Sequence, residues 1–134
     1  MFCMDNGETD LAKILRSLRP MLNEGDFVFC CVNDSSAIES SEIIMTFKEP
    51  QGSTVIIKKE LADKLKLDYT FVASWITLTV HSSLDAIGLT STFAKALADN
   101  SISCNVVAAF YHDHIFVNKN DAEKSMEVLR KLSE

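Results

Sequence analysis

The segment "FVASWITLTVHSSLDAIGLTSTFAKALADNSISCNVVAAFYHDHIFV", residues 71–117, decides the fold that we predict for this chain. Its opening residues, 71–81, alternate between apolar and polar side chains, which is typical of a strand with one buried face. One face of this strand carries Ile76, Leu78 and Val80, and the other carries Trp75, Thr77, Thr79 and His81. Apolar residues at helical spacing then predict a helix over 89–100, and the runs at 102–111 and 114–118 predict two more strands.

A helix over residues 121–132 completes this half of the chain. Its apolar stripe contains Ala122, Met126, Leu129 and Leu132. The resulting order is strand, helix, strand, strand, helix. That is the ferredoxin-like order without its last strand.

The first half of the chain predicts a second α+β module of similar size. We expect a helix over 8–18, a strand over 25–33, a hairpin over 42–59 that turns at Pro50-Gln51-Gly52, and a short helix over 59–67. Leu61 and Leu65 of this short helix should face inward. Residues 71–73 could serve this module as well. The sequence therefore predicts two small modules, residues 1–70 and 71–134, which share a sheet and each lack one piece.

Composition and charge narrow the classes of partner. The net charge is −6 without any block of like charge, which argues against nucleic acid and against an anionic membrane surface. A small-molecule or protein partner is then favoured by elimination. The four cysteines form no C-x-x-C pair, and the N-terminus shows no signal peptide, so we expect free thiols in a soluble, cytoplasmic protein.

The triplet His112-Asp113-His114 admits three interpretations. The predicted strands on either side are so close that a tight turn must lie at His112 and Asp113 or beside them, and both residue types tolerate positive φ. A metal site would need a third ligand, for which His81 is the candidate. A catalytic dyad would need a nucleophile, and Ser82, Ser83 and Thr92 have no nucleophile-elbow context. We favour the turn and expect no metal, no cofactor and no catalytic residue.

The segment "VHSSLDAIGLT", residues 80–90, is the better candidate for ligand binding. It leaves a strand, forms a loop and opens a helix, with Gly88 just before that helix. A glycine allows close approach of a ligand and unusual φ values, and the N–H groups at a helix start can hold a carboxylate. The alternative is an ordinary connection between a strand and a helix.

Two long strings carry a family resemblance. The strings HSSL-x-A-x-GLT and SCNVVA-x-x-x-HDHIFV, within residues 75–117, resemble a bacterial family of ACT-domain proteins of unknown function. The stretches at 25–32 and 49–57 resemble the N-terminal module of the same family. The resemblance covers about residues 8–132. It implies two ferredoxin-like modules, with antiparallel sheets and helices packed on one face.

The resemblance also implies a regulatory role and a place for the ligand. ACT domains typically bind amino acids or related small molecules where two modules meet, through the loop after the first strand. In this chain that loop corresponds to His81, Ser82, Ser83, Asp85, Ala86, Ile87, Gly88, Leu89 and Thr90. Two departures from the family pattern are Pro50-Gln51-Gly52 and Asn118, and the first puts a ligand role for residues 49–54 in doubt.

Three hypotheses of function follow. The leading one is a regulatory protein that senses an amino acid at a module or dimer interface, works as a homodimer and acts on a separate protein. The second is a protein-interaction module without a ligand, which would use edge strands and an exposed sheet face with Trp75 and Phe116. The third is a metal-dependent enzyme that uses His81, His112 and His114.

Overall fold

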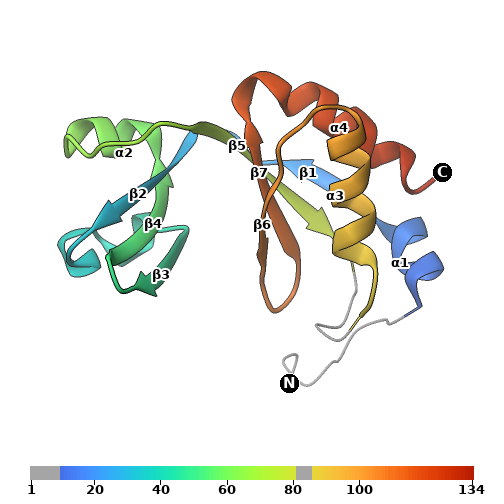
Figure 1. The fold of residues 1–134 in the computed structure, drawn as a ribbon, viewed down its shortest axis with the longest axis horizontal. Coiled ribbons are helices and arrows are strands. Elements are labelled where there is room, and N and C mark those ends of the chain that lie inside the picture. Colours follow the sequence, from blue (N-terminus) through green and yellow to red (C-terminus); the bar gives the residue numbers. More distant parts are fainter. Residues whose placement is uncertain (1–9, 81–85) are drawn as a thin grey trace. The chain divides into compact units, whose positions relative to one another are not determined.

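The structure is a computed structural model, and it describes residues 10–80 and 86–134. The chain divides into two compact units (Figure 1). Unit 1 comprises Met1–Asn23 and Trp75–Glu134, and unit 2 comprises Glu24–Ser74. The described N-terminal residues, 10–23, therefore belong to the same unit as the C-terminal half of the chain.

Unit 1 is a sheet with helices on one face (Figure 1). Its helices are α1 (Leu11–Ser17), α3 (Leu89–Asp99) and α4 (Ala122–Lys131), with a 3-10 turn η4 (Lys119–Asp121) before α4. Its strands are β1 (Arg19–Leu22), β6 (Asn105–Ala108), β7 (Asp113–Asn118) and most of β5 (Val72–Thr79). The strand order is β1-β5-β7-β6, and β6 pairs antiparallel with β7.

Strand β1 supplies the piece that the second half of the sequence lacks. It pairs antiparallel with β5 in the register Arg19↔Thr79 to Leu22↔Ile76. In a ferredoxin-like module the fourth strand pairs with the first, and β1 takes that place although it precedes β5 in the chain. The sequence reading assigned no strand to this segment. Pro20 is tolerated because β1 is an edge strand.

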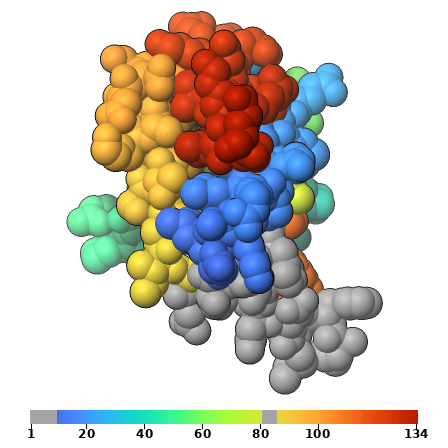
Figure 2. All heavy atoms as spheres, turned by 90° about the vertical axis from the view of Figure 1, so that its right-hand side faces the viewer, coloured from blue at the N-terminus to red at the C-terminus, as the bar shows by residue number. Residues whose placement is uncertain are grey.

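The core of unit 1 lies between the sheet and the helices. Ile14 and Leu18, both 0% exposed, come from the N-terminal segment and pack in one cluster with residues of β5, α3, β7 and α4. Figure 2 shows α1, in blue, beside the red α4 and the orange α3. The predicted apolar faces of the helices at 8–18 and 89–100 are therefore confirmed, and Asp10 caps α1 through its carboxylate.

Unit 2 has the same strand order. It contains β2 (Phe27–Val32), β3 (Met45–Glu49), β4 (Gly52–Lys58) and α2 (Lys59–Lys64), and its strands follow the order β3-β4-β2-β5. Val72 and Ala73 at the start of β5 pair with β2, so β5 ends one module and begins the other. Two 3-10 turns, η2 (Ser35–Ala37) and η3 (Ser40–Glu42), stand where the first helix of the module would be.

The predicted α+β fold with two ferredoxin-like modules is confirmed, and two burial predictions are wrong. Leu65 was expected to face inward but is 43% exposed, because α2 ends at Lys64. Phe116 was expected on an exposed face but is 1% exposed. Cys30 is buried and Cys31 is exposed, as their adjacent places on a strand predict, and both are free thiols.

Candidate functional site

The predicted ligand loop is described in part. His81, Ser82, Ser83 and Asp85 lie outside the described residues, and Ala86–Thr90 lie within them. Ile87 is 86% exposed, whereas Leu89 is buried in the core of unit 1. Ala86 is half-buried against the same core, and Thr90 is exposed.

Gly88 is required by the backbone at the start of α3. Its φ of 96° lies in the left-handed region that side chains disfavour. A Cβ at this position would stand 3.0 Å from Cδ2 of Leu11 on α1. The Gly88 carbonyl accepts hydrogen bonds from the backbone N–H of Thr92 at 3.0 Å, from the Thr92 hydroxyl at 2.6 Å and from the Ser91 hydroxyl at 3.0 Å.

The start of α3 offers donors to an anion. The first N–H groups of a helix have no acceptor within it, and the helix dipole is positive at this end. No side chain caps α3, since Gly88 is its N-cap residue. This geometry suits a carboxylate beside residues 88–90, and it equally fits an unliganded helix start.

The hairpin at residues 105–118 turns two residues earlier than the histidine triplet suggests. The N–H of Ala109 donates to the carbonyl of His112 at 3.0 Å, so Phe110 and Tyr111 form the tip. Asp113 is already the first residue of β7 and pairs with Ala108. The predicted hairpin is thus confirmed, but Asp113 as a turn residue is wrong. Among the described residues only Lys66 and Ser101 have positive φ without being glycine, so the tip needs none.

The side chains of His112 and His114 lie on the opposite face of the sheet from that of Asp113. Neighbouring strand residues point to opposite faces, which separates the Asp113 carboxyl from the His114 ring and does not suit a dyad. The rings of His112 and His114 are 6.5 Å apart between centroids. Burial raises the pKa of Asp113, and burial followed by the charge of His112 lowers the pKa of His114. Within residues 10–80 and 86–134, no three His, Cys, Asp or Glu side chains form a group that could hold a metal.

A hollow in unit 2 was missed by the sequence reading. It has a volume of about 500 Å³ and lies where β2 ends and the loop to η2 begins. That volume is in the range of small-molecule sites. Its lining consists of Cys31, Val32, Asn33, Asp34, Ala37, Ile38, Leu65 and Leu67. The sequence signal was the polar run 33–41, which we interpreted only as a serine-rich loop.

Asp34 supplies the ionised group of this hollow. Its carboxylate accepts the backbone N–H of Ser36 at 2.9 Å and so caps η2. Hydrogen bonding from the Ser36 side chain, followed by that from the Ser36 backbone N–H, lowers the pKa of the Asp34 carboxyl, which keeps it charged at neutral pH. The buried Ile38 and the partly exposed Leu65 and Leu67 add an apolar part. The hollow therefore combines a carboxylate with apolar surface.

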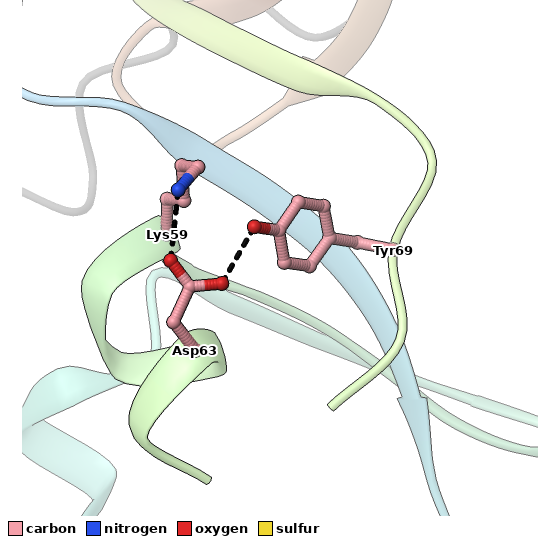
Figure 3. A network of polar contacts seen from close by, with 3 residues as sticks. All are labelled: Lys59, Asp63 and Tyr69. Carbon is pink, nitrogen blue, oxygen red and sulfur yellow. Dashed lines mark hydrogen bonds and ion pairs between the residues drawn. The ribbon is translucent and has the colours of Figure 1, made fainter. Parts of the chain in front are cut away.

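A polar network in unit 2 has the residue types of an acid–base site (Figure 3). Lys59 Nζ lies 2.8 Å from one Asp63 oxygen, and the Tyr69 hydroxyl donates to the other at 2.6 Å. The hydrogen bond to Asp63 raises the pKa of Tyr69, whereas a reactive phenol would need a lower one. We therefore assign the network a structural role: it ties α2 to the chain that leads into β5.

A second hollow of unit 2, of about 460 Å³, lies between η3, the start of β3 and α2. Lys58, Lys64, Glu42 and Glu60 line it with their exposed side chains. These two cations and two carboxylates balance in charge, so the hollow favours no ligand class.

Solved structures with similar folds include proteins of regulatory type. A protein of unknown function from Vibrio cholerae, described as a possible transport protein, is 45% identical; the match covers 92% of this chain and 96% of that one, with a TM-score of 0.85. A protein from Agrobacterium tumefaciens is 18% identical over 87% of this chain and 89% of that one, with a TM-score of 0.65. The ligand-free regulatory subunit of aspartate kinase from Thermus thermophilus is 8% identical, and the match covers 88% of this chain and 99% of that one with a TM-score of 0.61. At this identity the likeness shows the fold alone.

No curated protein matches the chain. No helix in the described part of the chain is long and apolar enough to span a bilayer. Family models described as ACT domain match residues 6–74 and residues 70–131. Together with the ferredoxin-like strand order of both units, these matches show that the chain belongs to the ACT-domain family and carries two ACT domains.

Proposed function

We propose that this protein is a small-molecule-binding regulatory protein that senses an amino acid. The observation that carries the proposal is the hollow of about 500 Å³ at the end of β2. It adjoins the loop after the first strand of its module, which is the loop that the ACT resemblance associates with ligands. The loop of residues 81–90 holds the same place in the other module, and both loops are proposed sites.

Each of these two loops has groups that suit a part of an amino acid. The Asp34 carboxylate can receive an ammonium group, while Leu65, Leu67 and Ile38 can contact an apolar side chain. At the other loop, the N–H groups that open α3 after Gly88 can receive a carboxylate. Regulation rather than catalysis is favoured because ACT-domain matches span residues 6–131.

A homodimer is part of the proposal. Strands β3 and β6 stand at the ends of the strand order, and edge strands can pair with another chain. Phe47 on β3 is 65% exposed and Val106 on β6 is 36% exposed. Sedimentation equilibrium measures the mass directly, and a monomer at the concentration where a ligand acts would contradict this part.

Thermal-shift measurements against the common amino acids test the ligand. An amino acid at 100 times its dissociation constant stabilises the folded state by about 2.7 kcal/mol, which raises Tm by several degrees. Asp34→Asn should weaken this shift for a ligand in unit 2, because asparagine still caps η2 but carries no charge. Glu39→Gln, an exposed carboxylate outside the hollow, is the matched control. If no amino acid at millimolar concentration raises Tm, the amino-acid proposal fails.

A protein-interaction module is the second candidate, and one observation favours it. The tip of the β6–β7 hairpin exposes two adjacent aromatic rings, Phe110 at 49% and Tyr111 at 54%. The rings meet edge to face, 5.1 Å apart between centroids. A partner captured equally with and without amino acids, and lost in the Phe110→Ser, Tyr111→Ser double variant, would support this function over ligand sensing.

A further inference from the structure

A cluster on the sheet face of unit 1 that lies opposite the helices has a specific hydrogen-bond pattern. We call Asn23, Trp75, Thr77, His114 and Phe116 the His114 cluster. The indole N–H of Trp75 donates to His114 Nδ1 at 3.0 Å, and the Thr77 hydroxyl lies 3.1 Å from the same nitrogen. The Asn23 amide donates to the Thr77 hydroxyl at 2.9 Å and to the Trp75 carbonyl at 3.2 Å.

This pattern determines the protonation state of His114. An indole nitrogen can only donate, so Nδ1 must present its lone pair, and the proton of the neutral ring resides on Nε2. A proton added to Nδ1 would face the N–H of Trp75. The Trp75–His114 hydrogen bond and a charged His114 ring therefore exclude each other.

The Trp75 ring is also part of the aromatic packing on this face. It stacks on Phe116 with 6.1 Å between centroids and 20° between planes, and it lies 5.7 Å from the His114 ring. Phe116 is 1% exposed and Thr77 is 5% exposed. A movement of the indole away from His114 would thus disturb the contact with Phe116.

Among the described residues, the strands around His114 offer few charged groups that could compensate a proton on its ring. Strands β5 and β6, which flank β7, contain no titratable side chain in Val72–Thr79 or Asn105–Ala108. Beside β7, a positive charge on His112 disfavours a second positive charge on His114. The Asp113 carboxyl points to the other face of the sheet and so does not face the His114 ring. Arg19 on β1, beyond β5, is also a cation. Burial and His112 both lower the pKa of His114, in agreement with this environment.

We propose that the His114 cluster is a pH-sensitive contact: neutral His114 holds Trp75 against Phe116, and protonation of His114 at Nδ1 releases Trp75. This inference is independent of the proposed amino-acid sensing. The direction follows from the hydrogen bonds. The contact is intact above the ordinary histidine pKa of 6.5 and is lost as the pH falls through the lower value of the folded state.

Trp75 is the single tryptophan of the chain, so its fluorescence reports this contact in the full-length protein. We expect the emission to change in one transition with a midpoint below pH 6.5, while far-UV circular dichroism stays constant. In His114→Asn the side-chain oxygen can stand where Nδ1 was and accept from the indole at every pH, so the transition should vanish. In the matched control His112→Asn it should remain.

Nitrogen-15 NMR of the histidine rings gives an independent measurement that does not depend on a variant. At pH 7.5 we expect His114 to carry its proton on Nε2 alone. A proton on Nδ1 at that pH would overturn the proposal. Tryptophan emission that stays constant while His114 titrates would also overturn the proposal. So would a transition that persists in His114→Asn and disappears in His112→Asn.

Discussion

Leu18 provides the most direct test of how the chain is divided. The residue follows α1, is 0% exposed and packs in the core of unit 1 with residues of β5, α3, β7 and α4. Leu18→Ala removes buried methyl and methylene groups and leaves a cavity. For a fully buried leucine the expected loss in the free energy of unfolding is about 3 kcal/mol. In a chain of this length, that loss lowers Tm by about 10 °C.

Two measurements check this expectation. Thermal unfolding gives the size of the effect, and Leu65→Ala, at a site 43% exposed, is the matched control that should cost less than about 1 kcal/mol. Hydrogen exchange locates the effect. Amides of α3, β7 and α4 should lose protection in Leu18→Ala, because these elements share a core with Leu18.

If Leu18→Ala were no more destabilising than Leu65→Ala, the N-terminal segment would not belong to this core. If protection fell in β2 and β4 while β7 and α4 kept theirs, the segment would instead belong with residues 24–74. Either result would contradict the assignment of residues 10–23 to unit 1.

Other predictions concern single groups. Gly88→Ala should destabilise the fold more than Gly25→Ala, although both glycines have positive φ. Of these two sites, a Cβ at Gly88 would stand 3.0 Å from Leu11, whereas a Cβ at Gly25 would stand 3.5 Å from Phe27; chemical denaturation measures both losses of stability. Asp63→Asn should lower the pKa of Tyr69 toward its ordinary value, because the hydrogen bond between the two side chains is the main cause of the raised pKa. Ultraviolet titration follows the phenol, and the difference from Tyr69→Phe isolates the signal of Tyr69. Burial raises the pKa of Cys104 to about 11, so its thiol should react with a disulfide reagent at pH 8 much more slowly in the folded protein than after unfolding.

Strand β1 could not be predicted from its own residues. A segment of four residues that contains a proline carries little strand signal by itself. Its pairing with β5 depends on residues more than 50 positions away, Thr79 to Ile76, and no local pattern encodes that partner. The incomplete ferredoxin order of residues 71–132 was the sequence signal that a strand had to come from elsewhere.

The hairpin shows a second limit. The short gap between the predicted strands placed the turn at His112 and Asp113 or beside them, and both residue types tolerate positive φ. The pairing of Asp113 with Ala108 instead places Phe110 and Tyr111 at the tip. The register of the two strands, rather than the turn preference of any residue, decided this position.

The sequence by itself determined the period of each long element, and hence the α+β class and the two modules. Alternation along 71–81 and the apolar stripes of the helices are local properties, since a strand or helix must bury one face wherever it lies. Only the tertiary structure decided which module receives α1 and β1, and that Phe116 is buried beside Trp75. It alone revealed the hollow beside Asp34. Each of these depends on which distant residues meet, because packing and hydrogen bonding between strands are set by neighbours in space.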